Sequence, residues 1–231
     1  MIKGIILDLD DTLYNYKKLN DLAIEEICKF TCKNLKISEE KFIKAFEAAK
    51  KNVKKQLTEK VASSHNRMLY CQKTLENLGE NPLSLSLKMY NIYWNYILKN
   101  MKLNKNVLEL LKFCKKEKIK VGICTDLTVN IQHKKIKKLK IDKYINALVT
   151  SEEAGEEKPS FKMYDLILKK LKISPQEALF IGDNLKKDVE GPSKYGMKTL
   201  LFSSEINEKY ESIKNFNEVL EKLKDEKNKK S

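Results

Sequence analysis

Four short segments of the chain carry side chains that could do chemistry, and three of the four contain aspartate. The segments are Asp8-Leu9-Asp10-Asp11-Thr12, Thr125-Asp126, Lys158-Pro159 and Gly182-Asp183, with Asp188 five residues further on. Carboxylates, a hydroxyl and a lysine are the groups that phosphoryl transfer uses. Clustered carboxylates repel one another, and a bound Mg²⁺ would relieve that repulsion because it prefers hard oxygen ligands.

The residue types indicate a separate role for each group. Asp8 is ionised at neutral pH and could attack phosphorus without a base. Asp10, its pKa raised by neighbouring acids, could protonate the leaving oxygen and then activate water. Thr125 and Lys158 would hold and neutralise the phosphoryl oxygens. Alone, each residue has a plainer interpretation, because aspartates at strand ends often cap helices or form turns, as Asp126 could.

A parallel sheet is the element that would bring these segments together. Short apolar runs typical of buried strands alternate with amphipathic helical patterns. The predicted strands are Ile2–Leu7, Ile119–Cys124, Ala147–Val149, Ala178–Ile181 and Thr199–Phe202. This alternation favours a Rossmann-like α/β core with right-handed crossovers. Ligands of such a sheet bind beyond the carboxyl ends of its strands, which is where the four segments stand.

The stretch 15–101 differs in composition and pattern, since it contains a single glycine and no convincing strand. Its pattern predicts about four helices, at roughly 18–35, 39–57, 59–78 and 83–99. The sequence therefore predicts two domains. An α/β core would comprise 1–14 and 102–231, and an all-helical domain of 15–101 would be inserted after the first strand.

The charge of the chain raises the alternative of a nucleic-acid-binding protein. There are 46 basic and 32 acidic residues, a formal net charge of +14, but 45 of the basic residues are lysines and Arg67 is the sole arginine. Arginine normally shares the reading of phosphates and bases, so we interpret the excess as a compositional bias of solvated helix faces and expect no nucleic-acid partner.

The composition also bears on where the protein is located and on what it binds. No apolar run is long enough to predict a membrane helix, so no membrane partner is expected. The five cysteines form no CxxC pair, which argues against both a disulfide framework and a zinc site. We expect a cytoplasmic monomer or dimer.

Taken together, the four segments resemble the motifs of the haloacid dehalogenase-like (HAD) hydrolase superfamily, over residues 2–202. The stretch from Asp8 to Leu13 is similar to the first motif, DxDxT, and 182–188 is similar to the fourth, GDxxxxD. Thr125 and Lys158 stand where the second and third motifs have their functional residues. The helical insertion resembles the C1 cap of subfamily I phosphatases, which excludes water and reads the substrate.

This resemblance implies the roles of individual residues. Asp8 would form an aspartyl-phosphate, and Asp10 would be the general acid/base. Mg²⁺ would be held by Asp8, the backbone carbonyl of Asp10 and Asp183, with Asp188 supporting the site from behind. The phosphate-binding residues would be Leu9, Thr125, Asp126 and Lys158. Asp126 is a departure, because many members carry Asn-Gly after the threonine.

The acid at Asp10 separates branches of the superfamily. The dehalogenases and phosphonatases lack it, so its presence implies phosphate monoester chemistry on a small phosphorylated metabolite, either a sugar phosphate or a nucleoside monophosphate. A sugar-phosphate mutase of the phosphoglucomutase-like branch keeps both acids and is the alternative.

Specificity is expected to come from the helical stretch, where Ser64, His65 and Arg67 stand close together. An arginine in a chain so rich in lysine suggests bidentate recognition of a carboxylate or phosphate, and a salt bridge on a helix face is the alternative. On one helix, Ser64 and Arg67 would be three residues apart and face the same way.

Overall fold

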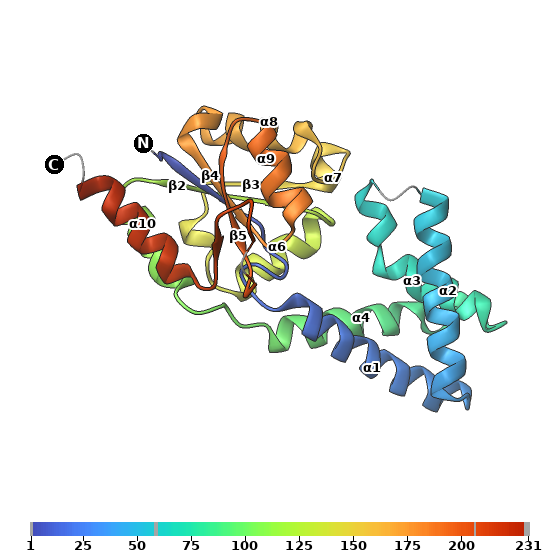
Figure 1. The fold of residues 1–231 in the computed structure, drawn as a ribbon. Helices are drawn as coiled ribbons and strands as arrows, with labels where there is room; N and C mark the ends of the chain where they lie inside the picture. Colours follow the sequence, from blue (N-terminus) through green and yellow to red (C-terminus); the bar gives the residue numbers. More distant parts are fainter. Residues whose placement is uncertain (1, 58–59, 206, 229–231) are drawn as a thin grey trace. The chain divides into compact units, whose positions relative to one another are not determined.

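The computed structural model describes residues 2–57, 60–205 and 207–228, and it divides the chain into two compact units (Figure 1). Met1–Asn15 and Lys102–Ser231 form one, called here the core unit, and Tyr16–Met101 forms the other, called the helical unit. Both ends of the predicted core domain, at residues 1 and 229–231, and the predicted helix start at 59 lie outside the described residues.

The core unit is built on a parallel sheet of six strands, in the order β3-β2-β1-β4-β5-β6. Its strands are β1 Gly4–Leu7, β2 Lys120–Thr125, β3 Ala147–Thr150, β4 Ala178–Gly182, β5 Lys198–Phe202 and β6 Ser212–Ile213. The sequence predicts the first five to within two residues, so the α/β fold is confirmed. β6 was not predicted, because two residues carry no periodic pattern.

Helices cover both sides of this sheet (Figure 1). In the core unit they are α5 Val107–Lys116, α6 Val129–Lys138, α7 Ser151–Ala154, α8 Phe161–Leu171, α9 Gly191–Lys194 and α10 Phe216–Asn228. α8 packs closely on β2, where a Cβ added to Gly122 would lie 2.9 Å from both Ile167 and Leu171. Glycine at this position lets the helix approach the strand.

The helical unit contains α1 Tyr16–Leu35, α2 Glu39–Leu57, α3 Arg67–Asn77 and α4 Pro82–Asn100. One helix was predicted from 59 to 78, but the chain instead forms a 3-10 turn at Ala62–His65 and restarts at Arg67. Asn66 causes the break, because its extended backbone and its side chain, which accepts from the backbone N–H groups of Met68 and Leu69, make it an N-cap. The prediction that Ser64 and Arg67 share one helix was therefore wrong.

None of the described helices combines the length and the apolar character of a membrane-spanning segment.

Candidate active site

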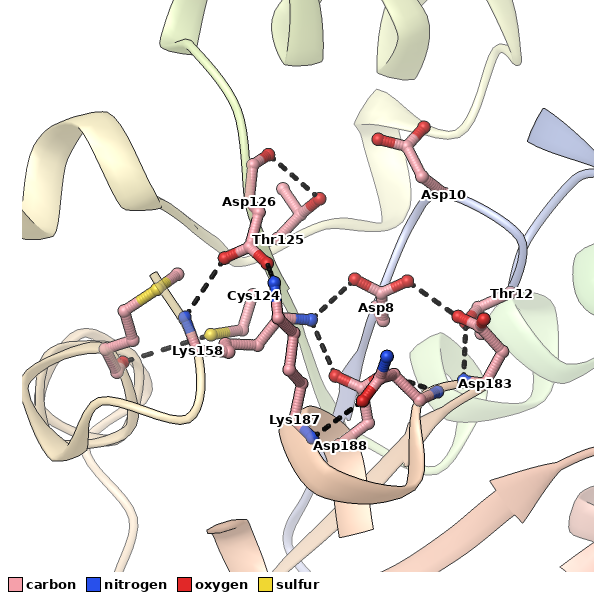
Figure 2. Close-up of polar contacts among 12 residues, drawn as sticks. Asp8, Asp10, Thr12, Cys124, Thr125, Asp126, Lys158, Asp183, Lys187 and Asp188 are labelled. Atoms are coloured by element: carbon pink, nitrogen blue, oxygen red, sulfur yellow. Dashed lines mark hydrogen bonds and ion pairs between the residues drawn. The ribbon is translucent and has the colours of Figure 1, made fainter. Parts of the chain in front are cut away.

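The centre of the site is a buried lysine between two buried aspartates. Lys158 Nζ lies 2.6 Å from Asp8 Oδ1 and 2.6 Å from Asp188 Oδ1, as Figure 2 shows. Exposed fractions are 6% for Asp8, 3% for Lys158 and 1% for Asp188. Asp8 directly follows β1, and its N–H donates to the carbonyl of Ile181 in β4, so the sheet itself sets its place.

A third acid, Asp183, lies at the exposed side of this centre. The buried hydroxyl of Thr12 lies 3.1 Å from Asp8 Oδ2 and 3.1 Å from Asp183 Oδ1, and it accepts from the Asp183 N–H. Oxygens of Asp8, Asp183 and Asp188 all lie within 4.8 Å of one another. Three carboxylates at this spacing could hold a metal ion.

Burial and mutual repulsion govern the charges of these acids. Burial raises the pKa of Asp8 well above its ordinary value, and the charges of Asp188 and Asp183 add to this effect against the attraction of Lys158. Burial, with the charge of Asp188, also raises the pKa of Asp183 to about 6. The expectation that Asp8 is ionised at neutral pH took no account of burial, which opposes the ionised form at this site, whereas the contact with Lys158 favours it.

Local sequence explains how the segment after β4 supports the site. A Cβ on Gly182 would lie 2.4 Å from the Asp188 carboxyl group, so only glycine lets that carboxylate fold back beneath the strand end. Asp188 Oδ2 accepts from the Asn184 N–H, and Asn184 Oδ1 accepts from the Lys187 N–H. Both oxygens of Asp188 are thus engaged, one of them by Lys158.

Asp10 departs from its predicted electrostatics. Its carboxylate points away from Asp8 (Figure 2) and binds Lys135 of α6, with Nζ at 2.7 and 2.8 Å from the two oxygens. Burial alone would raise the pKa of Asp10, but Lys135 and the hydrogen bonds of Tyr14 and Gln132 hold it below its ordinary value. The prediction of a pKa raised by neighbouring acids was wrong, because the nearest charge is a buried cation.

The predicted phosphate-binding residues lie along the same edge. Thr125 ends β2, and its buried hydroxyl accepts a 2.7 Å hydrogen bond from Gln132 Nε2. Asp126 Oδ1 accepts from the Lys158 N–H, and Asp126 Oδ2 lies 2.8 Å from Lys187 Nζ. Leu9 stands between Asp8 and Asp10 in the sequence, and its side chain is fully buried. Its backbone is therefore the part that could face a ligand.

Sequence reasoning missed three polar residues around the site: Gln132, Lys135 and Lys187. The sequence of α6 contains a pattern that could have identified Gln132 and Lys135. Its buried face consists of Ile131, Gln132, Lys135 and Ile136. A lysine in the apolar stripe of an amphipathic helix indicates a buried anionic partner, since an unpaired buried charge is very costly.

In the helical unit, Arg67 contacts neutral groups only. Its guanidinium donates to the hydroxyls of Tyr16 and Tyr93 and to the carbonyl of His65, and it lies over the Tyr70 and Tyr93 rings. Among the described residues it forms no ion pair. The side chain of Ser64 is fully buried, and its Oγ has no hydrogen-bond partner among them.

The acidic cluster and its buried lysine lie at the carboxyl edge of a Rossmann-like sheet, where such sheets bind ligands, and their groups are those that phosphoryl transfer uses. The sequence profile of the haloacid dehalogenase-like hydrolases matches residues 5–202, and the chain belongs to that family. The prediction of a HAD-type phosphatase is confirmed by this match and by the curated relatives.

Two curated relatives are similar to almost the whole chain. Ribulose-1,5-bisphosphate 5-phosphatase from Halopiger xanaduensis is 32% identical over 207 residues, which cover 87% of this chain and 85% of that protein. Glyceraldehyde 3-phosphate phosphatase from Methanopyrus kandleri is 27% identical over 204 residues, which cover 87% of this chain and 83% of that protein.

Solved structures show the same fold. The 2-haloacid dehalogenase from Pseudomonas syringae has a TM-score of 0.79 at 16% identity, with 97% of this chain and 99% of that chain covered. The HAD-hydrolase YfnB from Bacillus subtilis, solved bound to magnesium, has a TM-score of 0.68 at 16% identity, covering 96% of this chain and 98% of that chain.

Proposed function

We propose that the protein hydrolyses the phosphate ester of a small phosphorylated sugar through an aspartyl-phosphate at Asp8. The observation that carries the proposal is the buried contact of 2.6 Å between Asp8 and Lys158 at the carboxyl edge of the sheet. The relatives named above, which are phosphatases of phosphorylated sugars, support this substrate class over that of nucleoside monophosphates.

The proposed reaction has two steps. An oxygen of Asp8 forms a bond to phosphorus as the ester P–O bond breaks. Asp10, which Lys135 holds as a carboxylate in the ligand-free site, takes up a proton from solvent as it turns and gives that proton to the leaving sugar oxygen. Asp10 then accepts a proton from water, whose oxygen attacks the same phosphorus and releases inorganic phosphate and Asp8. Lys158 and Thr125 balance the charge on the phosphoryl oxygens. Asp10 must turn for this, because its carboxylate points away from Asp8 (Figure 2).

We propose that Mg²⁺ is the cofactor, and the donor set fits it. Asp8 and Asp183 provide hard anionic oxygens, and Asp188 lies behind them bound to Lys158. Burial, together with the neighbouring carboxylates, raises the pKa of Asp8 and of Asp183, and a divalent cation beside them would favour their ionised forms. When bound, the ion supplies positive charge beside the phosphoryl group.

Removal of divalent metal is expected to abolish turnover, by on the order of 10²-fold or more, and added Mg²⁺ to restore it. Release of inorganic phosphate after dialysis against a chelator measures this. A second readout is thermal unfolding, because an ion bound only by the folded state raises the melting temperature. The Asp183→Asn variant should lose most of that shift. Full activity after exhaustive chelation would contradict the metal assignment.

We propose that the helical unit acts as a cap and that Arg67 recognises an anionic group of the substrate. Its partners are the neutral oxygens of Tyr16, Tyr93 and His65, so they leave its positive charge uncompensated. A guanidinium whose charge is not compensated favours binding to a carboxylate or a phosphate. A role of Ser64 and His65 in substrate specificity stays a prediction.

A panel of phosphorylated metabolites tests both the substrate class and Arg67. Phosphorylated sugars, including bisphosphates, are expected to be hydrolysed faster than nucleoside monophosphates, with inorganic phosphate as product. Arg67→Met should raise KM for the best substrate about 10-fold, since it removes one charged contact. The exposed Lys88→Met in α4 is the matched control. An unchanged KM would show that Arg67 does not contact the substrate. Isomerised products in place of phosphate would favour a mutase.

A further inference from the structure

A charged pair beside the catalytic centre joins Asp10 to a helix that the reaction itself does not use. Lys135 is fully buried, with 0% of its side chain exposed, and its Nζ contacts both carboxylate oxygens of Asp10 at 2.7 and 2.8 Å. The hydroxyl of Tyr14 donates to the same carboxylate. An ammonium that reaches both oxygens neutralises the carboxylate and also fixes where it lies.

Gln132, one turn earlier on the same buried face of α6, adds a second restraint. Its Nε2 lies 3.1 Å from Asp10 Oδ2, 2.7 Å from Thr125 Oγ1 and 2.7 Å from the carbonyl oxygen of Asp126. A carboxylate and a carbonyl oxygen only accept, so they fix which end of the amide faces them. Gln132 therefore links Asp10 to the segment that would bind phosphate.

The oxygen end of the Gln132 amide indicates that a contribution to stability does not explain why glutamine stands at this position. Gln132 Oε1 is buried and has no hydrogen-bond partner in the part of the chain that the structure describes. A buried polar atom without a partner costs stability. A residue that carries such a cost while its amide nitrogen contacts three oxygens at the site fits a positioning role better than a packing role.

We propose that Lys135, assisted by Gln132, is a positioning residue that sets where the carboxylate of Asp10 lies, turned away from Asp8 and linked through Gln132 to Thr125. The proposal rests on the proposed function, in which Asp10 moves protons during turnover. α6 thereby determines the starting point from which Asp10 must turn to meet the leaving oxygen or the attacking water.

This role predicts a specific kinetic pattern. The Nζ of Lys135 binds the carboxylate of Asp10, which does not hold the substrate phosphate in the proposed reaction, so binding of that phosphate should survive the loss of Lys135. The proton transfers by Asp10 should slow, because without Lys135 the carboxylate no longer turns from one fixed starting position. A residue that acts only on the chemical steps changes kcat and leaves KM nearly unchanged.

The test compares Lys135→Met with Lys134→Met, its exposed neighbour in α6, using an aryl phosphate and the best sugar phosphate. Lys135→Met is expected to lower kcat on the order of 10- to 100-fold, within the contribution of general acid–base catalysis, with KM changed less than about 3-fold. Lys134→Met should match the wild type. If kcat per folded molecule is unchanged in Lys135→Met, the proposal is wrong.

A double-mutant cycle with Asp10→Asn shows whether Lys135 acts through Asp10. In the Asp10→Asn background, Lys135→Met should cause no further loss of kcat, and a full multiplicative loss would overturn the proposal. The double variant should also unfold at a higher temperature than Lys135→Met alone, because no unpaired buried carboxylate remains.

Crystal structures of the wild type and of Lys135→Met provide a readout independent of activity. The Asp10 side chain is expected to leave its place beside Gln132 in the variant, and an unmoved carboxylate would refute positioning by Lys135. A wild type without phosphatase activity would refute the proposed function, whereas this structural comparison would still decide the position of Asp10.

Discussion

Asp8→Asn is expected to abolish phosphatase activity, with a loss on the order of 10³-fold or more, while the protein stays folded. An amide has no anionic oxygen to attack phosphorus, so no covalent intermediate can form at this position. Stability should not fall, because burial raises the pKa of Asp8 and the ionised form is therefore held at a cost in the ligand-free protein. Phosphate release and thermal unfolding measure the two effects.

Asp11→Asn is the matched control for Asp8→Asn, since it makes the same chemical change in the same loop. Asp11 has a left-handed backbone, with φ of 63°, which asparagine also tolerates. Its activity should stay within about 3-fold of the wild type, because the proposal gives Asp11 no role in proton or phosphoryl transfer. Equal losses in the two variants would show that the loop, and not the nucleophile, was disturbed.

Lys158→Met is expected to have the second largest effect, on activity and stability together. The change removes the cation 2.6 Å from both Asp8 and Asp188 and leaves two buried carboxylates side by side. Breaking one partner of a buried ion pair costs about 3 kcal/mol or more in the free energy of unfolding. Loss of a charged donor to the phosphoryl oxygens should lower kcat/KM on the order of 10²-fold.

Two further variants separate these effects of Lys158. The exposed Lys162→Met, at the start of α8, controls for the loss of a lysine and should resemble the wild type. Lys158→Met combined with Asp188→Asn should regain much of the lost stability, since one buried charge is removed, yet stay as inactive as the single variant. If stability and activity returned together, Lys158 would be a structural residue only.

The sequence predicted most of the core unit because its signals are local. Buried parallel strands are short apolar runs, and Asp8, Thr125 and Gly182 directly follow or end such runs, so their meeting at one edge follows from the parallel topology. In the helical unit, helices were also predictable from their pattern. The break at Asn66 was not, because an N-cap inside a polar stretch gives no change in periodicity.

The charges of the site could not be predicted in the same way, since they depend on contacts between distant segments. Asp10 and Lys135 are 125 residues apart in the chain, yet their contact reverses the pKa shift expected from the nearby acids. The raised pKa of Asp8 likewise arises from burial in the folded core. A pattern of residue types identifies the groups that react, whereas their protonation states require the structure.

Chemical trapping of the phosphorylated protein tests the central proposal, that Asp8 is the nucleophile, most directly. The enzyme is mixed with a phosphorylated sugar, quenched in acid within one turnover, digested and mapped by mass spectrometry. We predict that the phosphoryl group is found on the peptide that contains Asp8 in the wild type, and on no peptide of Asp8→Asn. A phosphoryl group on another residue, or an active Asp8→Asn enzyme, would contradict the proposal.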